Sequence, residues 1–278
     1  MGVLEVPVLI VGGGGCGLTA SICLSDLGVE HLLVEKHPGT SHLPKAHFLN
    51  QRSMEVLRQH GVADSVYELG MPTESCKVRF VTSLAGDGPL DQRELFVFDA
   101  FGGGSLRQTY QRLSPCVTTN LPQLRLEPVL RRHAEERAPG KVRFGHELVD
   151  FSVDAYGVSA QILDHGTGDT FDVRARYVIG ADGGKTLGPR LGVTMEGPAG
   201  LLDLVSTHFS ADLSAWADES SLITWFLNPD GAGSWGSGVV APVSCTSGLR
   251  RQQTTSDRQI EDCSTYSTSF EFQIRWRR

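Results

Sequence analysis

The glycine-rich stretch after the first apolar segment constrains the fold more than any other part of the sequence. Residues 8–11 are apolar and mostly β-branched, and four glycines follow at positions 12–15. Apolar residues then recur with helical spacing until Gly28, and a second apolar run ends at Glu35. This order of strand, glycine turn, helix and strand predicts a βαβ unit.

Gly12, Gly14 and Gly17 have the Gly-x-Gly-x-x-Gly spacing of a dinucleotide-binding loop. The first glycine permits a tight turn, the second lets a pyrophosphate approach the backbone, and the third lets the helix pack closely on the sheet. The helix N-terminus then favours the phosphates. A flexible glycine loop beside an ordinary strand is the alternative, but the helix, the second strand and the acidic end favour a dinucleotide site.

Glu35 stands near the usual spacing for a carboxylate that binds the adenosine ribose. Because a carboxylate would repel a 2′-phosphate, an NADP-type adenosine is disfavoured at this site. The residues alone leave open which dinucleotide binds.

Charge and cysteine content exclude several classes of protein. The net charge is −7, so the chain lacks a basic footprint for nucleic acid, and no apolar run is long enough to span a membrane. The N-terminal apolar run leads directly into the glycine loop, which indicates a buried strand rather than a signal peptide. The six cysteines contain no Cys-x-x-Cys pair, which argues against a flavin disulfide reductase and a zinc ribbon. We expect a cytoplasmic protein with reduced thiols and no metal site, and the oligomeric state stays open.

The rest of the chain alternates between helical and strand-like patterns. Helices are predicted over 50–60, 62–69 and 121–137. Strands are predicted at 77–83, 93–98, 141–144, 147–153, 157–163, 170–175, 177–180, 201–210, 221–227 and 237–242. The four candidates between 141 and 175 indicate a three- or four-stranded antiparallel ribbon.

Three stretches in one order resemble a known family. They are the glycine loop with Glu35, the segment 50–55 followed later by 122–124, and the Gly-Ala-Asp-Gly-Gly turn at 180–184. Together they resemble the FAD-dependent aromatic hydroxylases, the single-component flavoprotein monooxygenases that include phenol hydroxylase and para-hydroxybenzoate hydroxylase. The nearest likeness is to the chlorophenol monooxygenases and their polyketide-hydroxylating relatives, and it covers roughly 6–242.

The resemblance implies an α/β fold. A Rossmann-like FAD-binding domain with a parallel sheet and an antiparallel ribbon would be interleaved with a partial mixed-sheet substrate domain. The predicted ranges are 1–80 and 111–200 for the discontinuous FAD-binding domain, 81–110 and 201–243 for the partial substrate-binding sheet, and 244–278 for a divergent tail. Two interpretations of this tail stay open, a disordered segment and the product of a shifted or alternatively spliced reading frame.

The resemblance also implies a set of cofactor-binding residues. They are Gly12, Gly14 and Gly17 at the FAD pyrophosphate, Glu35 at the adenosine ribose, Arg52 near the flavin, Gln123 at the ribityl and pyrophosphate part, and Asp182 at FAD and the transient nicotinamide cofactor. The alternatives are a solvated helix charge for Arg52, a helix-start cap for Gln123 and a plain turn residue for Asp182. No catalytic side chain is predicted.

The activity implied is hydroxylation of a phenolic or aromatic polyketide-type substrate in secondary metabolism, with FAD as cofactor, NAD(P)H as co-substrate and O2. The substrate face would come from segments 77–110 and 200–243. Trp225, Phe226 and Trp235 either line that face or belong to the core of the sheet.

Two departures from the family pattern qualify this prediction. Lys45 stands where relatives often carry an arginine, so any phosphate contact there would lack a guanidinium fork. The family's second Gly-Asp motif before a helix is absent, and composition changes sharply near residue 244, so the resemblance predicts a C-terminally truncated member. The alternative function is a truncated non-catalytic relative that binds FAD weakly or acts as an interaction partner. An NAD-dependent dehydrogenase ranks last, because further βα units do not follow Glu35.

Overall fold

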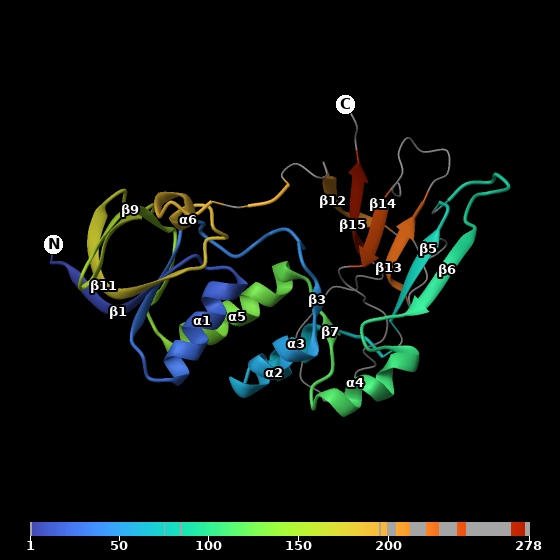
Figure 1. Cartoon of the computed structure of the whole chain (residues 1–278), viewed down its shortest axis with the longest axis horizontal. Coiled ribbons are helices and arrows are strands. Elements are labelled where there is room, and N and C mark those ends of the chain that lie inside the picture. The colour runs from blue at the N-terminus through green and yellow to red at the C-terminus, as the bar shows by residue number, and fades with distance from the viewer. Residues whose placement is uncertain are drawn as a thin grey trace, which may run out of the picture. The chain divides into compact units, whose positions relative to one another are not determined.

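The structure is a computed structural model, and its elements fall into two compact units (Figure 1). It describes residues 2–74, 76–83, 85–194, 196–198, 204–211, 221–227, 238–242 and 268–275. The first unit contains Met1–Ala46, Glu55–Leu69 and Pro122–Pro198, and the second contains His47–Met54, Gly70–Leu121 and Ala199–Arg278. The predicted α/β class is confirmed.

The first unit is built on a six-stranded sheet in the order β8-β2-β1-β11-β10-β9. Its strands are β1 (Leu4–Val11), β2 (His31–Glu35), β8 (Val142–Phe144), β9 (His146–Asp154), β10 (Gly157–Asp164) and β11 (Thr170–Gly180). The first four in the sheet order are parallel, and β10 and β9 continue it antiparallel. The carboxyl ends of β1, β2 and β11 therefore meet at one edge, where ligands bind in open α/β sheets.

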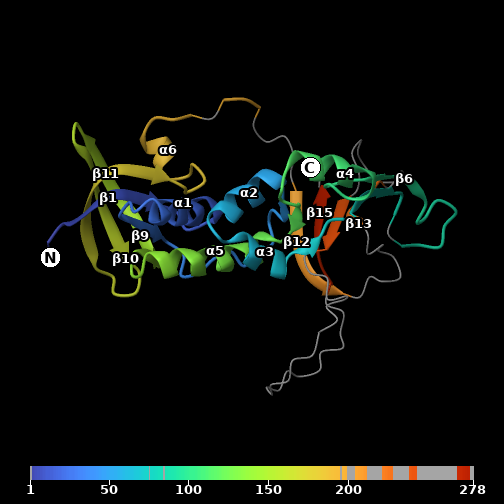
Figure 2. The same ribbon diagram turned by 90° about the horizontal axis from the view of Figure 1, so that it is seen from below.

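The first unit also contains helices, and its two longest lie side by side in both ribbon views (Figures 1 and 2). They are α1 (Gly15–Asp26) and α5 (Gln123–Arg137), with the shorter α3 (Ala63–Leu69) and α6 (Leu187–Arg190). Helix α2 (Gln51–Gln59) crosses the boundary between the two units. No helix in the described part of the chain is both long and apolar enough to cross a membrane.

The core of the first unit is formed by the apolar runs that predicted its strands. Leu9, Leu32 and Ile162 are fully buried in one cluster with residues of β9, β10 and β11. Strand β1 and the middle of β2 are mostly apolar, as is typical of a central parallel sheet with both faces covered.

Two details of this sheet differ from the sequence prediction. Strand β11 is continuous from Thr170 to Gly180, whereas two separate strands were predicted, because its pairing with β10 over 170–175 overlaps its pairing with β1 over 173–180. Strand β8 was predicted in the antiparallel ribbon but pairs in parallel with β2. The ribbon is therefore three-stranded, one of the two predicted sizes.

The second unit contains a mixed six-stranded sheet in the order β12-β15-β14-β13-β5-β6. Its strands are β5 (Lys77–Val81), β6 (Glu94–Asp99), β12 (Leu204–Ala211), β13 (Ser221–Phe226), β14 (Gly238–Pro242) and β15 (Thr268–Arg275). Only the described pair β13–β5 is parallel, and the other described pairs are antiparallel. Smaller elements are β3 (Phe48–Leu49), β4 (Met71–Pro72), β7 (Thr119–Asn120), the 3₁₀ turn Gly104–Leu106 and α4 (Arg107–Leu113).

The residue ranges of the two units differ from the predicted domain ranges. Strand β5 pairs with β6 and β13, so 77–80 group with the second sheet, and β7 draws 111–121 into the same unit. Strand β15 corrects the prediction for 268–275, which lie in the supposed disordered tail but pair with both β12 and β14. The remaining residues of 244–278 lie outside the described residues.

Candidate functional site

The glycine loop joins β1 to α1, and steric contacts require glycine at two of its positions. Gly12 has a φ of +111°, and a Cβ there would overlap the carbonyl oxygen of Ala181. A Cβ on Gly17 would overlap the carbonyl oxygen of Gly12 and lie 3.3 Å from the Ala181 Cβ. These two glycines let β1, the start of α1 and the end of β11 approach one another, as predicted from their spacing.

The next part of the loop forms a cradle of half-buried backbone with open space above it. A Cβ on Gly14 would meet only the Glu127 Oε1 atom, at an ordinary contact distance of 3.5 Å, and one on Gly15 would meet nothing within 4 Å. Among the described residues, no side chain caps the N-terminus of α1. The open space above Gly14 and the helix N–H groups fit a phosphate group.

Glu35 at the end of β2 faces this loop. Its Oε2 atom accepts a hydrogen bond from the Gly13 N–H at 2.7 Å, and its Oε1 atom accepts one from the His37 N–H at 2.8 Å. A Cβ on Gly13 would lie 2.7 Å from the Glu35 Cβ, so this position also requires glycine, although the fingerprint leaves it free. A carboxylate has about four acceptor positions, so Glu35 retains capacity for ribose hydroxyls.

Asp182 follows the end of β11, beside the glycine loop. The Ala181 N–H donates to the Val11 carbonyl oxygen at 2.8 Å, which places the two strand ends together. The Asp182 carboxylate accepts N–H bonds from Gly184 at 3.0 Å, Thr186 at 2.5 Å and Leu187 at 3.0 Å.

The charge of Asp182 follows from these contacts. Partial burial raises the pKa of Asp182, but the backbone N–H donors outweigh it and hold the pKa below its usual range. Asp182 therefore holds the turn after β11 together, next to the glycine loop, and its predicted role at FAD stays a prediction.

Gln123 begins α5 and is tied to the loop that precedes β3. Its backbone N–H donates to the carbonyl oxygens of Pro44 at 3.0 Å and Ala46 at 2.8 Å. Its side-chain Nε2 donates to the Glu127 Oε1 atom at 2.5 Å. Glu127 is 3% exposed and was not singled out from the sequence, although its spacing of four residues from Gln123 on a helix was the available signal.

The structure brings most of the predicted cofactor-binding residues together in the first unit. Arg52 is different, because it lies in the first turn of α2 within the range that groups with the second unit. Its predicted place near the flavin stays a prediction.

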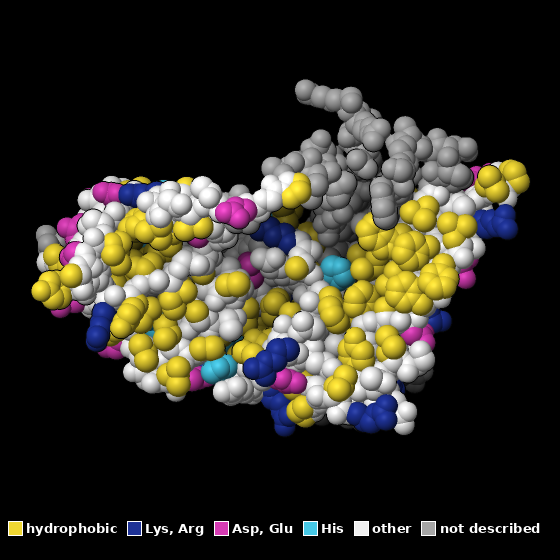
Figure 3. Space-filling view, in the orientation of Figure 1, with side chains coloured by type: hydrophobic (Ala, Val, Ile, Leu, Met, Phe, Trp, Pro, Cys, Tyr) yellow, Lys and Arg dark blue, Asp and Glu magenta, His cyan; other side chains and the backbone are white. Residues whose placement is uncertain are grey.

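A face of exposed aromatic side chains distinguishes the second sheet. Phe80 on β5 stacks with Trp225 on β13, with ring centroids 6.4 Å apart and an interplanar angle of 11°. Phe98 on β6 lies 6.3 Å from Phe80, and Phe96 lies 5.6 Å from Phe98. Figure 3 shows hydrophobic side chains gathered on the side where Figure 1 places β5 and β6.

The predicted aromatic residues of this sheet have different environments. Trp225 is 37% exposed and Phe226 is buried, so only the second is a core residue. Trp235 lies outside the described residues.

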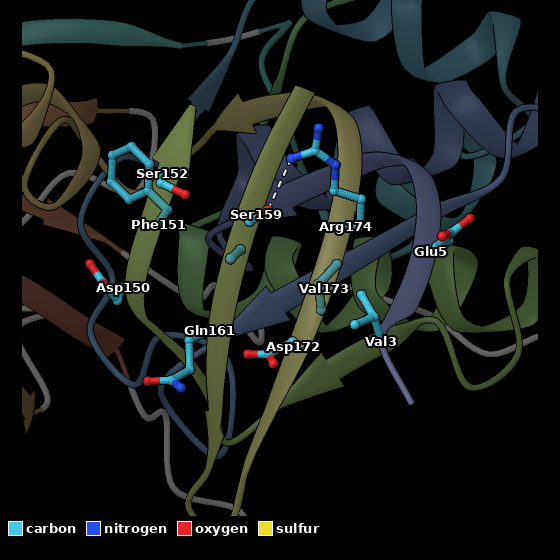
Figure 4. A pocket seen from close by; sticks show the side chains of 11 residues that line it. Val3, Glu5, Asp150, Phe151, Ser152, Ser159, Gln161, Asp172, Val173 and Arg174 are labelled. Carbon is cyan, nitrogen blue, oxygen red and sulfur yellow. Dashed lines mark hydrogen bonds between the residues drawn. The ribbon is translucent and has the colours of Figure 1, made fainter. Parts of the chain in front are cut away.

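An open groove of about 550 Å³ crosses β9, β10, β11 and the start of β1 (Figure 4). Val3 and Glu5 line it from the amino end of β1, which is the end opposite the glycine loop. Arg174 lines it too, and donates to the Ser159 hydroxyl at 2.9 Å and to Asp154 at 2.7 Å. None of the predicted cofactor-binding residues lines this groove.

Comparisons with known proteins agree with the geometry of the loop. A family model described as FAD binding domain matches residues 5–271. A 2,4-dichlorophenol 6-monooxygenase from Delftia acidovorans is 35% identical over 246 residues, which cover 87% of this chain and 41% of that protein. The aklavinone 12-hydroxylase DnrF of Streptomyces peucetius subsp. caesius is 35% identical over 237 residues, which cover 84% of this chain and 47% of that protein.

A solved structure shows the same fold. The flavin-dependent monooxygenase PieE, crystallised with FAD and substrate, matches with a TM-score of 0.82 and 36% identity over 99% of this chain and 43% of that one. The chain spans less than half the length of each of these proteins.

Proposed function

The chain belongs to the FAD binding domain family that includes phenol, chlorophenol and polyketide hydroxylases, and on that premise we propose that it binds FAD at the carboxyl edge of its first sheet as part of a monooxygenase. FAD is the cofactor of this family. The observation that carries the proposal is the open backbone at Gly14 and Gly15, framed by Glu35, Gln123 and Asp182.

The residues of the first unit have distinct roles in this proposal. The Gly14 backbone and the α1 N-terminus hold the pyrophosphate through N–H donors. Glu35 accepts hydrogen bonds from the adenosine ribose. Gln123 reaches the ribityl and pyrophosphate part, and Asp182 lies near both FAD and the transient nicotinamide cofactor.

The reaction proposed is hydroxylation of a phenolic or aromatic polyketide-type ring. Bound FAD supplies the redox chemistry between NAD(P)H, O2 and the ring, and the protein supplies binding and orientation. The exposed face formed by Phe80, Phe96, Phe98 and Trp225 supports an aromatic substrate, because planar rings stack on aromatic side chains. The relatives support it too, since their names record action on dichlorophenol and aklavinone.

The test is the visible absorbance spectrum of the purified chain after FAD is added and the excess removed. Stoichiometric flavin bands are expected. The Gly14→Ala variant is the sharpest comparison, because its methyl group would make only an ordinary contact with Glu127 and would occupy the place that we propose for the pyrophosphate. We expect it to keep the wild-type melting temperature and to bind FAD at least about tenfold more weakly.

Two outcomes would count against the proposal. A colourless wild-type protein in large excess of FAD would refute flavin binding. Bound flavin without NAD(P)H oxidation in the presence of candidate phenols would favour the alternative of a non-catalytic relative.

A further inference from the structure

We propose that Glu127 is a positioning residue that sets the orientation of the Gln123 side-chain amide and thereby the affinity for FAD. The inference rests on the proposed FAD site. It concerns a buried carboxylate that neither the glycine fingerprint nor the family resemblance singles out.

The Glu127 carboxylate is held in place on both of its oxygens. It is 3% exposed, and its Oε2 atom accepts the Ser41 N–H at 2.8 Å, from a loop far away in the sequence. Its Oε1 atom accepts the Gln123 Nε2 at 2.5 Å. A buried carboxylate with two donors has little freedom to move, so it acts as a fixed acceptor.

A fixed acceptor determines which way an amide points. Both Glu127 oxygens act as acceptors, so the nitrogen of the Gln123 amide faces Glu127 and its carbonyl oxygen faces away. Without that constraint, a glutamine amide can rotate by half a turn and exchange its donor and acceptor ends. Glu127 therefore decides what Gln123 presents to a ligand.

The same carboxylate lies next to the phosphate cradle. Its Oε1 atom is the neighbour that a Cβ on Gly14 would meet, at 3.5 Å. The Gln123 amide that shares this oxygen is thus close to the predicted pyrophosphate position. The backbone of Gln123 is held as well, because its N–H bonds Pro44 and Ala46 on either side of Lys45, which has a left-handed φ of +44°.

The experiment compares two ligands and two glutamates in the full chain. The variant E127Q is isosteric but lets the amide of Gln123 adopt either orientation. The control E135Q removes a carboxylate from the same helix, where Glu135 Oε1 pairs with Arg131 Nε at 2.7 Å on the exposed side. Dissociation constants are measured for FAD by flavin fluorescence and for AMP, which lacks the ribityl part and the second phosphate, by calorimetry.

We expect E127Q to weaken FAD binding at least about twofold, because an amide that samples both orientations equally presents the correct end to FAD in only about half of the molecules. AMP binding and the FAD affinity of E135Q should stay at wild-type values. In a Gln123→Ala background, E127Q should weaken FAD binding no further, because Glu127 acts through that amide.

Several results would overturn the inference. Unchanged FAD affinity in E127Q, an equal loss for AMP, or an equal loss in the Gln123→Ala background would each refute it.

If E127Q does not fold, the wild-type ¹⁵N–¹H spectrum decides. One Gln123 amide proton should then be shifted downfield relative to those of the exposed Gln161, and equal shifts would refute the inference. A wild-type chain that binds no FAD refutes the proposed function, whereas equal FAD binding by E127Q refutes this inference alone.

Discussion

The centre of the first sheet and the edge strand β6 of the second differ in the exposure of their apolar side chains. In the first, Leu9 and Leu32 are completely buried, whereas in the second Phe96 is 61% exposed and Phe98 is 40% exposed. The central strands β1 and β2 of the first sheet bury their apolar side chains, and the loop after β1 leaves backbone open at Gly14 and Gly15. The second leaves aromatic side chains open. An exposed apolar face of this kind indicates binding rather than core.

The comparison predicts very different costs for truncating an apolar side chain in each sheet. Leu33→Ala on β2 removes a fully buried side chain and should lower the free energy of unfolding by about 3 kcal/mol. Phe96→Ala on β6 should lower it by less than about 1 kcal/mol. Urea denaturation measures both. Equal losses would break the comparison, because they would show that Phe96 is buried in solution.

Substitutions in the packed part and in the open part of the glycine loop should also differ in their effect on stability. Gly12→Ala combines a positive φ with overlap on Ala181 and should cost about 2–3 kcal/mol. Gly15→Ala, at the start of α1 with open space around it, should be neutral or stabilise by about 0.5 kcal/mol. Thermal unfolding of the two variants tests this. A similar loss in both would show that the loop is uniformly packed.

The smallest expected effect on the free energy of unfolding concerns one ion pair in each unit. Asp26 at the end of α1 accepts hydrogen bonds from His60 Nδ1 at 2.6 Å and Arg137 Nε at 3.0 Å. Burial raises the pKa of Asp26, but these partners outweigh it, so the pKa lies below its usual range. The folded pKa is below the unfolded value, so this stabilisation is present above the unfolded pKa of about 3.9 and is lost as the pH falls through the folded pKa.

Asp26→Asn should therefore reduce stability at neutral pH and flatten its fall in acid, as measured by urea denaturation between neutral pH and about pH 3. The second sheet offers a matched pair in Arg79 and Glu94, 2.9 Å apart across β5 and β6, in which the carboxylate is more exposed than that of Asp26. Glu94→Gln should change stability by less than about 0.5 kcal/mol. An equally flat acid profile in both variants would contradict the special role of Asp26.

The sequence predicted the βαβ unit well, because its elements are adjacent in the chain and each carries its own signal. The apolar run, the glycines and Glu35 needed no distant partner to be interpreted. The pairing of β8 with β2 could not be predicted in this way. Val142 joins Leu33 from more than a hundred residues away, and a three-residue strand has no alternation that distinguishes parallel from antiparallel pairing.

Two other features had a signal that was missed. Phe270, Phe272 and Ile274 alternate with polar residues, which is a strand pattern, but the polar composition around them concealed it. The family match also continues to residue 271. Glu127 is harder to find, because a glutamate on a helix is usually solvated, and only the fold brings Ser41 and Gly14 to it.

The pairing of β1 with β11 has a consequence for the order of folding. Leu4 pairs with Val173, and Val11 with Gly180, so the central contact of the first sheet joins the beginning of the chain to a strand made much later. At a synthesis rate of about 5–20 residues per second, β1 waits on the order of ten seconds for that partner. During this interval the N–H and C=O groups along one edge of the apolar strand β1 are unpaired, and an unpaired edge of this kind can pair with other chains. The cradle is assembled only after that wait, since the Ala181 backbone that closes it against Gly12 arrives with β11.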